Sequence, residues 1–166
     1  MAHAVVRTDK LFGTDNRTGL ASVEYFVSTT ATDIDNGNVV VVGDLIDGER
    51  EIYKATTPAV DTAIEKIVLI ATPEVNYCPK EYPIENFYNK AGKPARGYYL
   101  THNAIFSVTK DALDGAATPA VGDIVELKAG TKLNVVSSAT SGSTVVGKII
   151  AIDTVGRFTF YVIQVD

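Results

Sequence analysis

The chain has 166 residues, a formal net charge of −5 and a hydrophobic fraction of 46%. This length predicts one domain, or one domain with an arm, that is large enough to bury a core. The acidic balance argues against nucleic-acid binding, which relies on clustered Lys and Arg. No apolar run reaches the roughly 18 to 20 residues that cross a membrane, and the N-terminus lacks the apolar middle region of a signal peptide. We therefore expect a soluble protein, made in the cytoplasm, with no nucleic-acid or membrane partner.

Residues 1–21 are predicted to form an extended N-terminal arm, and residues 22–166 a single β-rich domain. The arm is dense in Gly, Thr, Asp and Asn, which favour turns over regular structure. Two interpretations remain open. Leu11 and Phe12 pin a tail onto the body, or the arm reaches a partner and adds a strand to the edge of its sheet.

Short strands are predicted next, at 22–28, 39–42, 51–55 and 66–71. Their spacing of about ten residues is typical of a barrel or a sandwich. The runs at 39–42 and 66–71 are continuously apolar, which indicates buried strands. Residues 33–37 carry acidic side chains at alternate positions, as a calcium loop does. Because the glycine is one place early and no glutamate closes the loop, we interpret this segment as a solvated turn.

A long connection at 74–95 interrupts the pattern of strands, and at most 84–90 forms one or two helical turns. Such connections are uncommon inside compact domains and are often functional. Its aromatic residues either cover one end of the barrel as an accessory core or form an exposed, tyrosine-rich contact surface. Lys90, Lys93 and Arg96 form a local basic cluster that favours a solvated loop or a protein contact, since three cations are too few for nucleic-acid binding in an acidic chain.

The rest of the chain predicts strands rich in Val, Ile, Phe, Tyr and Thr, separated by breaks that mostly contain Gly. They lie at 97–101, 104–109, 123–129, 131–137, 144–153 and 157–165, with one helical turn at 110–113. The fold class is therefore mainly β. We expect a compact β-barrel or β-sandwich of short antiparallel strands, with an extended N-terminal arm and at most one or two short helices.

No catalytic or cofactor motif is found in the sequence. Phosphate-binding and dinucleotide-binding glycine motifs are absent, as is the alternation of strands and helices that they need. His3 and His102 are the only histidines, so a triad or zinc site in the body would depend on His102 alone. Cys78 is the only cysteine, which excludes an internal disulfide and favours a small, partly buried thiol. We expect a protein that is not an enzyme and has no catalytic residue, metal or cofactor.

Several short sequence segments, spread from about Ala31 to the end of the chain, nevertheless resemble a known family when they are taken together. They are Asp33-Ile-Asp-Asn-Gly-Asn-Val-Val-Val-Val, Gly48-Glu-Arg-Glu-Ile-Tyr-Lys-Ala-Thr-Thr-Pro-Ala, Lys66-Ile-Val-Leu-Ile-Ala-Thr-Pro-Glu-Val, Arg96-Gly-Tyr-Tyr-Leu, Ile105-Phe-Ser-Val-Thr, Gly122-Asp-Ile-Val-Glu-Leu and Gly147-Lys-Ile-Ile-Ala-Ile. As a set they resemble small structural proteins of tailed bacteriophages of Gram-positive hosts, in particular the capsid decoration, or cement, proteins.

This resemblance implies a compact β-rich body with an N-terminal segment that lies along the outer surface of the capsid. The expected partner is the major capsid protein, whose neighbouring subunits such proteins clamp, often as trimers at local three-fold positions of the virion. The family carries no catalytic residues. From position and composition, the residues expected to contact the capsid are Val5, Val6, Arg7, Leu11, Phe12, Tyr82, Tyr88, Lys93 and Arg96.

Two other functions remain open. A carbohydrate- or ligand-binding β-module would use the Tyr-rich loop, with Tyr77, Tyr82, Tyr88 and Tyr99 around one pocket and asparagines such as Asn76, Asn86 and Asn89 bonding to hydroxyl groups. Another component of a phage head or tail is also compatible with the resemblance. A concave pocket walled by these tyrosines favours ligand binding, whereas a flat apolar patch beside an extended arm favours a cement protein.

Overall fold

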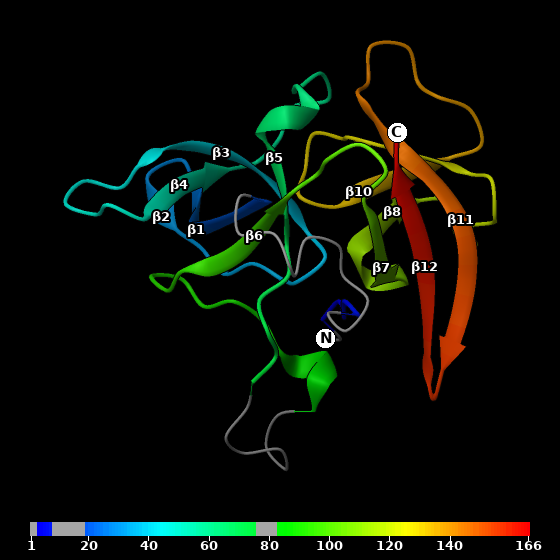
Figure 1. Ribbon diagram of the computed structural model, residues 1–166, viewed down its shortest axis with the longest axis horizontal. Helices are drawn as coiled ribbons and strands as arrows, with labels where there is room; N and C mark the ends of the chain where they lie inside the picture. Colours follow the sequence, from blue (N-terminus) through cyan, green and yellow to red (C-terminus); the bar gives the residue numbers. More distant parts are fainter. Residues whose placement is uncertain (1–2, 8–18, 76–82) are drawn as a thin grey trace.

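The computed structural model describes residues 3–7, 19–75 and 83–166. Within these residues the protein is mainly β, as the sequence predicts. Two six-stranded sheets lie beside each other, one closed into a barrel and the other open and curled (Figure 1). The helical parts of the described chain are three 3₁₀ turns of three residues each: η3 (Ile64–Lys66), η4 (Ile84–Asn86) and η5 (Lys110–Ala112). The sequence predicts the second and third of these, but not η3.

The first sheet contains β1 (Leu20–Val27), β2 (Thr30–Ala31), β3 (Val39–Leu45), β4 (Ile52–Thr56), β5 (Ile67–Ile70) and β6 (Ala95–Tyr99). Its strands follow the order β2-β1-β4-β3-β5-β6, and an additional pairing of β1 with β6 closes five of them into a barrel. β1 and β4 run parallel, unlike the antiparallel arrangement predicted for the strands. The sequence pattern identifies each strand, but the direction of a distant partner depends on the connections between them.

The barrel is filled by the alternate side chains of its strands. Val23, Tyr25, Val40, Val68 and Ile70 belong to one buried cluster, as period-two alternation requires. The opposite faces of β3 and β5, which carry Val39, Ile67 and Leu69, pack into a second and larger cluster.

The second sheet contains β7 (Ile105–Thr109), β8 (Leu113–Gly115), β9 (Ile124–Glu126), β10 (Leu133–Val136), β11 (Val145–Val155) and β12 (Phe158–Val165). Its order is β7-β12-β11-β9-β10-β8, and only the β8–β10 pair is parallel. The long hairpin of β11 and β12 forms the side of the molecule that is farthest from the barrel (Figure 1). A register shift between Ile149 and Ala151 marks an irregularity in this hairpin.

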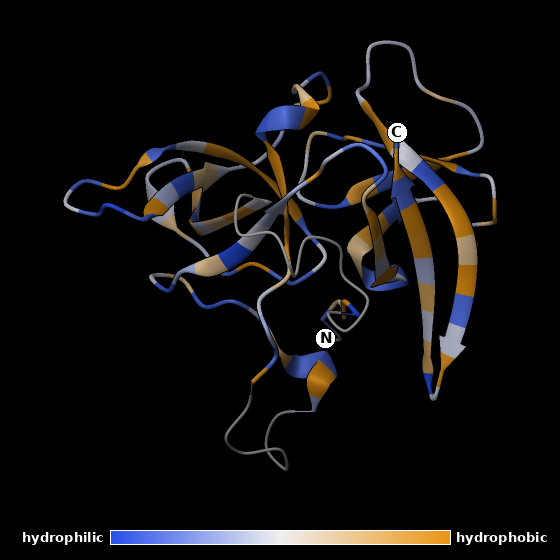
Figure 2. Cartoon of the chain, viewed as in Figure 1, coloured by the Kyte–Doolittle hydropathy of each residue, from blue (hydrophilic) through white to orange (hydrophobic). Residues whose placement is uncertain are grey.

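The two sheets share one core, and β5 is its centre. All four residues of β5 are completely buried, because Val68 and Ile70 face the barrel interior while Ile67 and Leu69 pack with Phe106 and other residues of the second sheet. Figure 2 shows this strand as uninterrupted hydrophobic colour. The sequence analysis predicted a buried strand here, and the structure confirms it.

Candidate functional site

The N-terminal residues 3–7 lie along the edge of β7 as an additional short strand. Val6 forms an isolated antiparallel bridge with Val108. The Arg7 backbone N–H donates to Ser107 O at 3.3 Å, and the Thr109 N–H donates to Val5 O at 3.1 Å. The Val5 N–H donates to the Thr109 hydroxyl at 3.1 Å. These bonds cover a sheet edge that would otherwise expose unpaired backbone groups.

The side chains of this segment are part of the domain's own interior. Val5 is 3% exposed and Val6 is 2% exposed. Val6 joins the large core cluster, together with Ala4. Val5 and Val6 are predicted to contact a capsid; in the structure both side chains are buried, and both also line the hollow described next. Leu20 and Ala21, which the prediction places at the end of the arm, are the first two residues of β1.

Beside this segment lies a cavity of about 260 Å³ that we call the apolar hollow. Residues from the N-terminal segment, the chain after β5, η4 and the tip of the β11–β12 hairpin surround it. They are Val5, Val6, Arg7, Glu74, Ile84, Val155, Phe158 and Phe160. Ile84 and Val155 are 41% and 47% exposed, and they lie together on the lining of one hollow rather than singly on the surface. The hollow therefore presents apolar surface to solvent.

Cation–aromatic contacts hold the walls of the apolar hollow. The Arg7 guanidinium carbon lies 5.7 Å from the centre of the Phe160 ring, and that of Arg157 lies 5.1 Å from the Phe158 ring. Arg157 Nη2 also donates to Glu85 Oε2 at 2.5 Å. This ion pair joins the hairpin tip to η4, so the two exposed walls are fixed relative to each other.

Glu74 connects the apolar hollow to the loop before β3. Burial raises the pKa of the Glu74 carboxyl, against the opposing effect of hydrogen bonds from the Asn36 side chain and the Val6 backbone. Asn36 is completely buried, and its Nδ2 also donates to Thr72 O at 2.8 Å. Its Oδ1 accepts hydrogen bonds from the Thr72 N–H and from Asn89 Nδ2. One amide thus satisfies backbone and side-chain groups from two other segments of the chain, at 72–74 and at 89.

This network replaces the solvated turn predicted at 33–37. Asn36 and Gly37 are buried, and a Cβ atom on Gly37 would meet Ala112 Cβ at 2.7 Å. Asp33 Oδ1 accepts the Ala91 N–H, and Asp35 Oδ1 is hydrogen-bonded to His3. Residues 33–37 are therefore held by backbone and side-chain partners.

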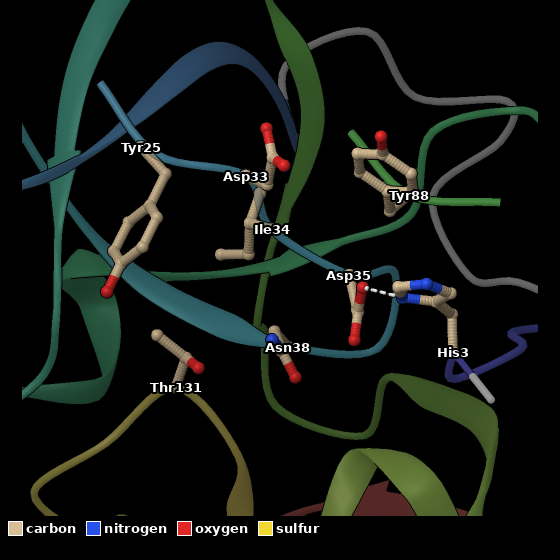
Figure 3. A pocket seen from close by; sticks show the side chains of 8 residues that line it. All are labelled: His3, Tyr25, Asp33, Ile34, Asp35, Asn38, Tyr88 and Thr131. Atoms are coloured by element: carbon tan, nitrogen blue, oxygen red, sulfur yellow. Dashed lines mark hydrogen bonds and ion pairs between the residues drawn. The ribbon is translucent and has the colours of Figure 1, made fainter. Parts of the chain in front are cut away.

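A second cavity, which we call the polar hollow, has a volume of about 380 Å³. It is formed by the N-terminal segment, β1, the loop between β2 and β3, the connection between η4 and β6, and the connection between β9 and β10. Its lining residues are His3, Tyr25, Asp33, Ile34, Asp35, Asn38, Tyr88 and Thr131 (Figure 3). His3 Nδ1 lies 2.7 Å from Asp35 Oδ1, and the His3 ring stacks on Tyr88 with centroids 5.2 Å apart. The docking of residues 3–7 thus completes one wall of this hollow.

The remaining predicted contact residues are distributed as follows. Tyr88 lines the polar hollow, while Lys93 and Arg96 are exposed on the turn before β6 and on β6 itself. Leu11, Phe12 and Tyr82 lie outside the described residues, as do Cys78, Tyr77 and Asn76.

The structure does not place the described tyrosines around one pocket. Tyr99 lines a different cavity from Tyr88, together with Leu100 and His102. Asn89, which was considered as a sugar ligand, is buried and donates to Ile34 O and to Asn36. The single tyrosine-walled pocket expected for a carbohydrate module is therefore not formed by the described residues.

Sequence reasoning missed most of the two hollows. The sequence could have predicted part of the apolar hollow from Val155 and Phe158. Both are apolar residues directly beside a Gly-containing turn, where a side chain is exposed unless something covers it. The hydrogen bond between His3 and Asp35 could not be predicted from neighbouring residues, because it depends on where residues 3–7 dock.

Comparison with known proteins found no matching family model, no similar curated protein and no similar solved structure. Across residues 3–7, 19–75 and 83–166, no helix has the length and apolar character needed to cross a membrane. In the same part of the chain, no three His, Cys, Asp or Glu side chains are grouped to hold a metal ion.

Proposed function

We propose that the protein is a non-enzymatic structural component of a tailed-phage virion. It binds the outer surface of the capsid and stabilises the shell by bridging subunits of the major capsid protein. The single observation that carries the proposal furthest is the apolar hollow beside the N-terminal segment. Its surface is hollowed rather than flat, but it is apolar and lies beside the N-terminal segment, where the contact surface of a cement protein is expected.

The chemistry of the apolar hollow suits contact with another protein. Exposed Ile84 and Val155 offer apolar area, and the half-buried Phe158 adds an aromatic ring. Arg7 and Arg157 lie over aromatic rings at its edge, and arginine and aromatic residues are enriched where interfaces are strongest. Covering these side chains would remove apolar surface from water, which favours association.

Multivalency accounts for the stabilisation of a shell. A body that contacts two or three capsid subunits makes each later contact intramolecular, so modest contacts add up to firm attachment. Trimers of the protein at local three-fold positions would extend the same effect. The two sheets pack around β5 in one shared core, which suits a clamp.

The test is co-sedimentation of the purified full chain with expanded, empty capsids. Removing residues 2–20 is a poor variant, because it would delete core residues Ala4 and Val6 and the first residue of β1. Val155→Asp and Ile84→Asp instead place a charge on the exposed wall of the hollow. Val27→Asp is the matched control, since Val27 is 51% exposed, lies at the end of β1 and does not line the hollow.

We expect the wild type and Val27→Asp to co-sediment equally. Val155→Asp and Ile84→Asp should weaken attachment by about tenfold or more, because an unpaired charge would be buried at the contact. Equal binding by all variants would move the contact away from the hollow. Failure of the wild type to co-sediment would contradict the proposed function itself.

A further inference from the structure

The polar hollow has the features of a small-molecule binding site, and these features are independent of the proposed capsid contact. Asp33 and Asp35 both line it, and no Lys or Arg is among the described residues that do so. In Figure 3, Tyr25 and Tyr88 lie on opposite sides of the set of lining residues, and the carboxylates of Asp33 and Asp35 lie between them. The lining is therefore rich in hydrogen-bond acceptors and in aromatic surface.

Both carboxylates keep acceptor capacity after their intramolecular bonds are counted. Asp33 Oδ1 accepts the Ala91 N–H at 2.8 Å, and Asp35 Oδ1 is bonded to His3. An ionised carboxylate has two oxygens and about four lone-pair sites. These protein bonds use one oxygen of each group and fix its orientation.

Asn38 supplies a second observation at this hollow. Its side chain lines the hollow and is only 6% exposed, yet Asn38 Oδ1 has no hydrogen-bond partner. Leaving a buried acceptor unpaired costs about 1–3 kcal/mol, and buried polar groups in native proteins almost always have a partner. Figure 3 places the Asn38 side chain between Asp35 and Thr131, on the wall of the hollow.

We propose that the polar hollow binds a primary alkylammonium group, held by Asp33, Asp35 and the amide of Asn38. An ammonium has three donors and no acceptor, which matches carboxylate and amide oxygens. Its positive charge is attracted to the two carboxylates, and tyrosine rings stabilise a nearby cation. A phosphate or a carboxylate ligand would meet two like charges without a compensating Lys or Arg.

The same chemistry is offered by a free amine and by a lysine side chain of a protein segment. The test is a titration of the ¹⁵N-labelled full chain, followed by nuclear magnetic resonance. The probes are n-butylammonium, the capped peptide acetyl-Gly-Lys-Gly-amide, and the neutral compounds n-pentanol and methyl glucoside. Ionic strength and pH are held constant in every titration, because screening changes the interaction between charges.

We expect saturable shifts of the Asn38 side-chain amide and of the Ala91 N–H with the ammonium probes, and none with the neutral ones. Tighter binding of the peptide would assign the site to lysine, and tighter binding of butylammonium would assign it to a free amine. Asp33→Asn and Asp35→Asn should each weaken binding by about tenfold or more, since each removes a charge-assisted hydrogen bond. Asp44→Asn, in an exposed part of β3, should leave it unchanged.

The proposal is overturned if ammonium probes cause no saturable shift, or if methyl glucoside binds and butylammonium does not. It is also overturned if both Asp variants bind as tightly as the wild type. The comparison of amine with alcohol needs only the wild-type protein, so a variant that folds poorly does not prevent a decision. Loss of capsid binding, in contrast, would leave this site unaffected.

Discussion

The buried carboxylate of Glu126 holds Thr140 through two hydrogen bonds. Its Oε2 accepts the Thr140 backbone N–H at 2.9 Å, and its Oε1 accepts the Thr140 hydroxyl at 2.8 Å. Asn134 Nδ2 donates a third bond at 2.9 Å. Burial opposes ionisation of Glu126, but the three bonds together outweigh it and lower the pKa. This carboxylate therefore fixes the loop between β10 and β11 to β9.

Glu126→Gln should destabilise the protein by about 1–3 kcal/mol, because the new NH₂ group would face the Thr140 N–H with two donors and no acceptor. Glu51→Gln, at an exposed position, should change stability by less than about 0.5 kcal/mol. Urea unfolding measures both. Because the Glu126 pKa is lowered, its contribution is present above the ordinary value of 4.5 and is lost as pH falls through the lowered pKa. The difference in the free energy of unfolding between wild type and Glu126→Gln should therefore become smaller in acid. A difference that becomes larger in acid would contradict a stabilising role for the ionised carboxylate.

Gly97→Ala should destabilise the barrel by about 1–3 kcal/mol through overpacking. A Cβ atom at Gly97 would lie 2.8 Å from Val68 Cγ2 and 3.0 Å from Val68 Cβ, and Val68 is completely buried on β5. Gly130→Ala is the control, since a Cβ atom there meets nothing within 4 Å. Thermal unfolding of both variants measures the difference.

A second substitution tests whether Val68 is the cause of the Gly97→Ala effect. Combining Gly97→Ala with Val68→Ala removes the methyl groups that the new Cβ meets, so the two substitutions should be less costly together than their sum. Simple additivity would show that the clash is relieved by another route.

The strands were predictable because each carries its own signal. The buried run at β5 and the alternation in β1 are properties of a few neighbouring residues, and both predictions agree with the structure. The parallel pairing of β1 with β4 was not predictable in this way, because both directions bury the same side chains. Local pattern determines which face of a strand is apolar, but not which strand lies beside it.

The N-terminal segment and the asparagines show where local reasoning fails. Ala4, Val5 and Val6 form too short a run to predict a strand, and their burial depends on β7 providing an edge. Asn36 and Asn89 were interpreted as turn or ligand residues because asparagine is usually exposed. In the folded protein they bond to each other and to the backbone of Ile34 and Thr72, so their burial has no unpaired polar group to oppose it.

Val6→Ala should lower the free energy of unfolding by about 2 kcal/mol, since it removes two buried methyl groups and leaves space in the core. Val27→Ala is the control, because Val27 is 51% exposed. Urea midpoints of the two variants provide the measurement. Equal, small effects would mean that residues 3–7 do not pack in solution as they do in the structure.

Glu74→Gln should stabilise the protein at neutral pH relative to the wild type. Burial raises the pKa of Glu74, so the folded state binds its proton more strongly than the unfolded state does. As pH rises from about 4.5 through the raised pKa, the folded wild type must ionise a partly buried group and loses stability relative to the unfolded chain. Glutamine never ionises, yet its carbonyl oxygen can still accept the hydrogen bond that Asn36 or Val6 donates.

The difference between Glu74→Gln and wild type should therefore grow with pH above about 4.5 and level off once Glu74 is fully ionised. Urea unfolding at intervals from about pH 4 to about pH 8 measures it, with Glu51→Gln as the exposed control. A constant difference at every pH would show that the pKa of Glu74 is the same in the folded and unfolded states. A variant that loses stability relative to wild type as pH rises would show that the ionised Glu74 is worth more to the docking of residues 3–7 than its burial costs.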